Sequence, residues 1–116
     1  MSLVTYSLVG CGFSRMAENL INEHNIKNVL HKVEQKDKDE YKKLNDMNTF
    51  PQIFIEHNNK NLKIGGYSNL NDIFNIVNSK KKLDNITKEL SEYLNIDYNQ
   101  NKRIILELIN LLIKKL

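Results

Sequence analysis

The hydrophobic pattern at the start of the chain predicts a strand followed by a helix. Residues 3–8 are rich in β-forming side chains and end shortly before Gly10, which indicates a short buried strand and a turn. After Gly12, apolar residues recur at three- and four-residue spacing, at Phe13, Met16, Ala17, Leu20 and Ile21. This spacing predicts a helix that begins beside Cys11 and ends near His24.

The following segments repeat this order. Residues 28–33 predict a second strand, and residues 35–47 predict a polar helix whose Tyr41 and Leu44 face inward. Because crossovers between strands of one sheet are right-handed, we expect the two strands to be parallel neighbours.

A hairpin follows the only proline, Pro51. Residues 52–56 predict one strand, residues 58–61 the turn, and residues 62–64 a shorter antiparallel strand. Together the four strands predict a single mixed sheet of an α/β protein, with helices over both faces.

A further helix is expected after the Gly65-Gly66 pair, which breaks the sheet. Ser68 or Asn69 is the expected N-cap, and the apolar positions of the helix are Leu70, Ile73, Phe74 and Val77. This helix completes a βαβ unit followed by a ββα unit.

The rest of the chain is a tail that this sheet does not need. We divide the chain into a domain at residues 1–79 and a helical C-terminal extension at residues 80–116, with helices expected over 84–95 and 101–116. The last helix is largely apolar but too short and too interrupted to span a bilayer. Packing against the main domain or against a second copy is favoured over a membrane surface.

Composition supports one compact domain. Of the 116 residues, 41% are hydrophobic and 27% charged, and the mean hydropathy is -0.50. The start of the chain lacks the basic and apolar segments of a secretory signal, so a cytoplasmic location is expected. The net charge is +3, and the short run at residues 80–82 accounts for three of the positive charges. We therefore expect neither a nucleic-acid partner nor membrane contact.

Cys11 is the only cysteine, which excludes an intramolecular disulfide and a cysteine-rich zinc site. Its expected place at a helix start lowers a thiol pKa, because the free amides and the helix dipole favour the thiolate. Gly12 permits close backbone approach, Phe13 provides an apolar wall, and Ser14 stands where many disulfide oxidoreductases carry a resolving cysteine. Taken alone, a cysteine at such a position is more often structural than reactive.

Three ordered motifs resemble those of the glutaredoxins. CGFS at residues 11–14 is the signature of the monothiol branch of that family. TFPQIFI at residues 49–55 resembles its Thr-Val-Pro-Gln strand, and GGYSNL at residues 65–70 resembles its Gly-Gly-Cys-Asp-Asp-Leu turn. The resemblance covers residues 3–78 and implies a thioredoxin-like fold, with a four-stranded mixed sheet flanked by helices.

The resemblance also implies a glutathione site. In the family, the proline corresponding to Pro51 is cis and faces the reactive Cys11 across a groove. The cysteine of glutathione pairs with the residue at Phe50 as an added strand does. The γ-glutamyl carboxylate lies at the helix start, against the amides of Tyr67 and Ser68. With Cys11 as the catalytic residue, the implied glutathione-binding residues are Phe13, Thr49, Phe50, Pro51, Gly66, Tyr67 and Ser68.

Two functions follow from the resemblance. The first is a monothiol, glutathione-dependent thiol-disulfide oxidoreductase that acts on glutathionylated proteins and small mixed disulfides. The second is a carrier in which two chains, each with Cys11 and one glutathione thiolate, hold a [2Fe-2S] cluster, so that Cys11 is a metal ligand only there. A homodimer through the cluster, or through the C-terminal helices, belongs to the expected partners.

The chain departs from the family in several places. Leu8 stands where members commonly carry a lysine that steadies the thiolate; Arg15 could replace that cation or could be a solvent-exposed helix residue. The loop before Cys11 is short, and the chain has no tryptophan. The short loop and the missing Trp-Pro segment of the monothiol branch indicate a compact, dithiol-type frame with a monothiol active sequence, and they count against the cluster carrier.

Overall fold

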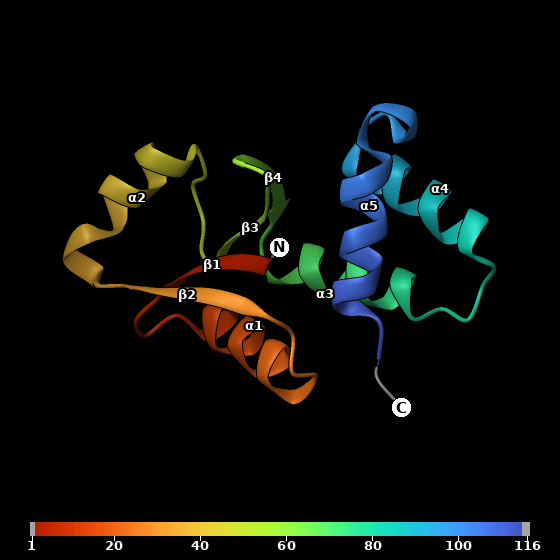
Figure 1. The fold of residues 1–116 in the computed structure, drawn as a ribbon. Coiled ribbons are helices and arrows are strands. Elements are labelled where there is room, and N and C mark those ends of the chain that lie inside the picture. The colour runs from red at the N-terminus through yellow and green to blue at the C-terminus, as the bar shows by residue number, and fades with distance from the viewer. Residues whose placement is uncertain (1, 115–116) are drawn as a thin grey trace.

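A computed structural model describes residues 2–114 (Figure 1). The elements in chain order are β1 (Ser2–Leu8), α1 (Gly12–Glu23), β2 (Asn28–Val33), the 3-10 turn η1 (Gln35–Asp37), α2 (Lys38–Asn45), β3 (Gln52–His57), β4 (Lys60–Gly65), α3 (Tyr67–Val77), α4 (Leu83–Leu94) and α5 (Tyr98–Leu112). The predicted order of strands and helices is confirmed.

The four strands form one sheet in the order β2-β1-β3-β4. β1 and β2 are parallel, with Leu3 opposite Asn28 and Leu8 opposite Val33. β3 is antiparallel to both β1 and β4. The chain therefore has the predicted thioredoxin-like fold of glutaredoxins, followed by C-terminal helices.

The hairpin turn is tighter than expected. Asn58 and Asn59 have φ values of 48° and 65°, and β4 already begins at Lys60 rather than at residue 62. Asparagine tolerates the left-handed region better than most residues, so two residues suffice to reverse the chain.

The two faces of the sheet are unequally covered. Leu3, Thr5 and Ser7 of β1 are 0%, 0% and 1% exposed on the face that packs against α1 and α3. α2 lies on the opposite side of the sheet from α1 (Figure 1), and its Tyr41 packs against Tyr6 with 5.6 Å between ring centroids.

The prediction that Leu44 faces inward is wrong, because this side chain is 70% exposed. α2 is short and preceded by the 3-10 turn, so it meets the sheet through Tyr41 and leaves its other apolar side chain in solvent. Helices cover the second face only in part.

The C-terminal extension belongs to the same hydrophobic core as the sheet. Ile86 and Leu90 of α4 and Ile105 and Leu108 of α5 lie in one buried cluster with core residues of β1, β3, α1 and α3. His57 of β3 adds a polar contact to this packing, with Nδ1 2.7 Å from a carboxylate oxygen of Glu107 in α5. The expected packing of the tail against the main domain is confirmed.

α5 begins and ends earlier than predicted. The Asp97 side chain caps its start by accepting a hydrogen bond from the Gln100 amide at 3.2 Å. At its end, Asn78 at the end of α3 donates to the Leu112 carbonyl at 3.1 Å and accepts from the Lys114 amide at 2.8 Å. These bonds supply partners for the last turn, and the helix stops at Leu112. The predicted continuation to residues 115–116 lies outside the described residues.

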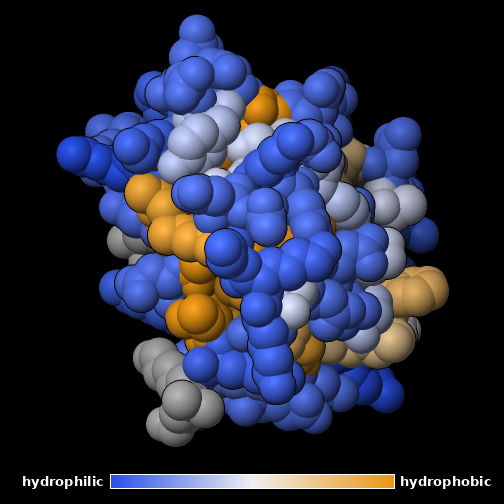
Figure 2. Space-filling model, turned by 90° about the vertical axis from the view of Figure 1, so that its right-hand side faces the viewer, coloured by the Kyte–Doolittle hydropathy of each residue, from blue (hydrophilic) through white to orange (hydrophobic). Residues whose placement is uncertain are grey.

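The face formed by α4 and α5 is mainly hydrophilic, with apolar side chains gathered in small patches (Figure 2). Within residues 2–114, no helix combines the length and the apolar character that a membrane crossing requires.

Candidate functional site

The turn between β1 and α1 places Cys11 at the N-cap of α1. Gly10 takes a φ of 83°, which is accessible to glycine at little cost. The Cys11 amide donates to the Leu8 carbonyl at 3.1 Å, and the side chain of Gln35 donates to the Val9 carbonyl at 2.6 Å. The loop that carries the cysteine is therefore held from both the strand and η1.

The helix start favours the ionised form of Cys11. Partial burial of the sulfur raises its pKa, but hydrogen bonds from the Ser14 amide, the Ser14 hydroxyl and the Phe13 amide outweigh burial and lower the pKa below its ordinary value of 9.0. Backbone and hydroxyl donors thus stabilise the thiolate in this chain, which has Leu8 at the position where glutaredoxins commonly carry a lysine. Arg15 lies close enough to Glu18 for its charge to lower the pKa of that carboxyl.

Ser14 is a structural part of the turn. Its side chain is 1% exposed, and its hydroxyl oxygen accepts a hydrogen bond from the Leu8 amide at 3.0 Å. Phe13 is 63% exposed beside the cysteine, and a Cβ on Gly12 would meet no atom within 4 Å. The surface around the sulfur is open.

The segment before β3 faces Cys11. The Phe50-Pro51 peptide bond is cis, as the resemblance implied, and the sulfur of Cys11 lies 3.8 Å from the carbonyl oxygen of Phe50. Phe50 and Pro51 are buried, whereas Thr49 is exposed.

Gln52 fixes the cis-proline segment through two side-chain hydrogen bonds. Its side chain is fully buried, accepts a hydrogen bond from the side-chain nitrogen of Asn45 at 2.8 Å and donates to the Met47 carbonyl at 3.1 Å. These bonds fasten the end of α2 to the strand that follows Pro51. The glutamine was visible within the TFPQ motif, but the sequence did not indicate its partners.

The Gly65-Gly66 turn lies next to the proline. A Cβ on Gly66 would lie 3.8 Å from the carbonyl oxygen of Pro51, so the two segments are in contact. Gly65 has a φ of 123°, and a Cβ there would clash with the side-chain oxygen of Asn69. Glycine is required at this position by both backbone conformation and space.

The N-cap of α3 is Gly66, not Ser68 or Asn69 as predicted. Asn69 stands at the third helical position, and its side-chain oxygen accepts a hydrogen bond from the Gly66 amide at 3.0 Å. Asn69 thus supplies the half of a capping box in which the side chain at the third helical position satisfies the N-cap amide, whereas Gly66 has no side chain to accept from the amides of the first turn. Tyr67 is half-buried and Ser68 is exposed at the helix start.

The fold brings Cys11 to Phe50, and Pro51 to Gly66, with Tyr67 and Ser68 on the adjoining helix start. Phe13 follows Cys11 by two residues and Thr49 directly precedes Phe50, and both side chains are exposed to solvent. Two stabilising residues had no sequence signal: Gln35, which holds the loop before Cys11, and Tyr93 of α4, which hydrogen-bonds Asn69 at 3.1 Å.

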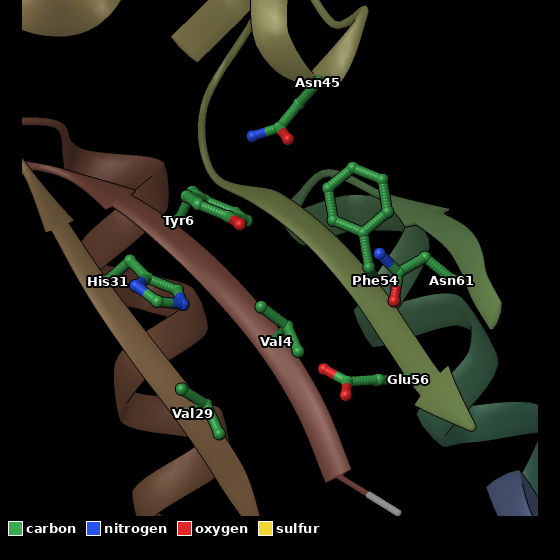
Figure 3. Close-up of a pocket in the computed structure, with 8 residues that line it drawn as sticks. All are labelled: Val4, Tyr6, Val29, His31, Asn45, Phe54, Glu56 and Asn61. Atoms are coloured by element: carbon green, nitrogen blue, oxygen red, sulfur yellow. The ribbon is translucent and has the colours of Figure 1, made fainter. Parts of the chain in front are cut away.

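A separate cavity of about 130 Å³ lies on the second face of the sheet (Figure 3). Its lining comes from all four strands and from the end of α2, and consists of Val4, Tyr6, Val29, His31, Asn45, Phe54, Glu56 and Asn61. It includes none of the residues predicted for the glutathione site.

One chain offers a metal ion few ligands. Within residues 2–114 there is no group of three or more His, Cys, Asp or Glu side chains placed to hold a metal ion. Any cluster at Cys11 would need further thiolates from outside the chain.

The fold and the site define a thioredoxin-like α/β protein whose single thiol lies at a helix N-cap, opposite a cis-proline. A family model described as glutaredoxin matches residues 3–59, the part that runs from β1 through β3. Residues 3–59 thus have the sequence features of a glutaredoxin domain, and glutaredoxins are thiol-disulfide oxidoreductases that use glutathione. No curated protein and no solved structure matches the chain significantly.

Proposed function

We propose that the protein is a monothiol, glutathione-dependent thiol-disulfide oxidoreductase. The observation that carries this proposal is the position of Cys11: its pKa is lowered by the helix start, and its sulfur lies 3.8 Å from the Phe50 carbonyl. The thiolate is the nucleophilic form of cysteine, so the sulfur is activated at the edge of the cis-proline segment.

The reaction proceeds by two exchanges. The Cys11 thiolate attacks the glutathione sulfur of a mixed disulfide, a Cys11-glutathione disulfide forms, and the substrate leaves as a thiolate that takes a proton from water. The thiolate of a second glutathione then attacks the glutathione sulfur bound to Cys11. This step releases oxidised glutathione and restores the Cys11 thiolate, so no second protein thiol is needed.

The proposed residues bind the tripeptide along the groove. The backbone of Phe50 pairs with the cysteine of glutathione, and the amides of Tyr67 and Ser68 receive the γ-glutamyl carboxylate at the start of α3, where free amides favour an anion. Phe13, Thr49, Pro51 and Gly66 form the walls. Glutathionylated proteins are the proposed substrates.

The test is turnover of a glutathionylated peptide, coupled to consumption of NADPH by glutathione reductase. Cys11→Ser is expected to abolish turnover, and Ser68→Ala, which keeps the backbone amide, is expected to retain most of it. Full activity of Cys11→Ser would exclude the proposed mechanism, as would an inactive wild-type protein that is folded and fully reduced.

The cluster carrier is a second candidate, favoured by the open surface around the thiol. No atom lies within 4 Å of the position that a Cβ on Gly12 would take, and Phe13 is 63% exposed, so a second chain has room to approach Cys11. Anaerobic reconstitution with iron, sulfide and glutathione separates the candidates. A [2Fe-2S] absorption spectrum that requires glutathione, together with a doubled molecular mass, would support the carrier; its absence in a turnover-competent protein would exclude it.

A further inference from the structure

A chain of hydrogen bonds joins the C-terminal extension to the Gly65-Gly66 turn. The side-chain nitrogen of Asn69 donates to the hydroxyl of Tyr93 in α4 at 3.1 Å, and that hydroxyl donates to Asp72 at 2.8 Å. The side-chain oxygen of Asn69 accepts from the Gly66 amide at 3.0 Å. The chain therefore runs from α4 to the N-cap of α3.

The direction of these bonds follows from the chemistry of the groups. A carboxylate only accepts hydrogen bonds, so the Tyr93 hydroxyl donates to Asp72 and its oxygen stays free to accept from Asn69. The nitrogen of the Asn69 amide then points to Tyr93, and its oxygen points to Gly66. Because the two ends of a side-chain amide have nearly the same shape, the Tyr93 hydroxyl reinforces the orientation in which the Asn69 oxygen accepts from the Gly66 amide.

The turn that Asn69 holds lies against the cis-proline segment. The Asn69 side chain fills the space beside Gly65, where a Cβ would clash with its oxygen. Gly66 in turn contacts Pro51, and the amides of Tyr67 and Ser68 follow directly. A rotation of the Asn69 amide would therefore disturb the end of the groove at which an anion would bind.

We propose that Tyr93 is a positioning residue of the glutathione site, acting through Asn69 to hold the Gly65-Gly66 turn in place for the γ-glutamyl carboxylate. This inference rests on the proposed function. It gives the extension a part in ligand recognition, although every site residue implied by the resemblance lies before residue 79.

The experiment compares Tyr93→Phe with Tyr98→Phe in the full chain. Each change removes one hydroxyl from the extension, but the Tyr98 hydroxyl makes no hydrogen bond to any residue among 2–114. Two properties are measured: the exchange rate of the Gly66 amide proton in the free protein, and the affinity for S-methylglutathione, which keeps the carboxylates but cannot exchange disulfides. For Tyr93→Phe we expect faster Gly66 exchange and about threefold to tenfold weaker binding, the effect of one hydrogen bond. Tyr98→Phe should match the wild type in both.

A double-mutant cycle with Asn69→Ala tests the path of the effect. If Tyr93 acts through Asn69, Tyr93→Phe has no further effect on binding once Asn69 is replaced. Additive losses, or a Tyr93→Phe variant with wild-type Gly66 exchange and wild-type affinity, would overturn the inference. A wild-type protein that binds no S-methylglutathione would overturn the proposed function together with the role of Tyr93 in ligand binding. The exchange rate of the Gly66 amide proton in free Tyr93→Phe would still show, separately, whether Tyr93 holds the turn.

Discussion

The hydroxyl oxygen of Ser14 accepts a hydrogen bond from the backbone amide of Leu8 at 3.0 Å, in the first turn of the helix that begins at Cys11. The residue that replaces a resolving cysteine thus joins the first turn of α1 to the end of β1. The same hydroxyl is among the groups that lower the pKa of Cys11. Ser14 therefore has a structural and an electrostatic role, and both can be measured.

Ser14→Ala is expected to change both properties. It leaves the Leu8 amide without this partner, which should lower the free energy of unfolding by about 1–2 kcal/mol. It also removes one hydrogen bond to the sulfur, so the pKa of Cys11 should rise toward its ordinary value of 9.0. Chemical denaturation and the pH dependence of alkylation report the two effects. Asn19→Ala, on the exposed side of the same helix, is the control and should alter neither; an unchanged alkylation profile in Ser14→Ala would contradict the electrostatic role.

The reactivity of Cys11 should show its lowered pKa directly. In wild-type protein, the rate of alkylation by iodoacetamide should rise with pH around a midpoint below 9.0, because the thiolate is the reacting form. A midpoint at or above 9.0 would contradict the assignment.

The same shift links stability to pH. Because the native pKa of Cys11 is lower than the unfolded pKa, the thiolate stabilises the folded state; this contribution is complete above pH 9.0 and is lost as the pH falls through the native pKa. The stability of wild type relative to Cys11→Ser should therefore increase with pH over that window. Denaturation of both reduced proteins at several pH values measures it, and a pH-independent difference would exclude the linkage.

Glu18 should make the fold sensitive to acid. Burial raises the pKa of this carboxyl, but hydrogen bonds from Lys32 at 2.7 Å and Ser7 at 2.5 Å, together with the charges of Lys32 and Arg15, lower it below its ordinary value of 4.5. A lowered carboxyl pKa contributes stability that is complete above pH 4.5 and is lost as the pH falls through the native pKa.

Glu18→Gln should therefore cost about 1 kcal/mol at neutral pH and reduce the loss of stability in acid. Glu23→Gln is the matched control, because Glu23 is exposed on the same helix and makes no hydrogen bond or ion pair to the other described residues. Parallel stability curves for Glu18→Gln and wild type below pH 4.5 would show that Glu18 does not supply the effect.

The C-terminal extension should be essential to the stability of the whole chain. Leu108 of α5 is 0% exposed in the common core, so Leu108→Ala should lower the free energy of unfolding by about 2–5 kcal/mol. Leu44→Ala, at a position 70% exposed, should change it by less than about 0.5 kcal/mol. Probes in the sheet and in α5 should report one transition; a separate early transition of α5 would mean that the extension is not part of the cooperative unit.

Much of the fold and part of the site could be predicted because their signals are local. The β-forming run before Gly10 and the helical spacing after Gly12 predicted β1 and α1, and with them the place of Cys11 at a helix start. Leu44 misled the prediction, because an apolar residue on a helix indicates a core only where another element lies opposite it. The N-cap of α3 was also predicted wrongly. Ser68 and Asn69 are both good capping residues, and only the path of the chain places the helix start at Gly66.

The amino-acid sequence by itself determined the order of the elements, the single thiol and its position at a helix start, because these depend on residues close together in the chain. The tertiary structure alone decided that Cys11 meets Phe50, that Asn78 ends α5, and that Tyr93 reaches the turn at Gly66. Such contacts join residues that are distant in sequence. They depend on how the helices pack over one shared core, and a local pattern of side chains does not predict that packing.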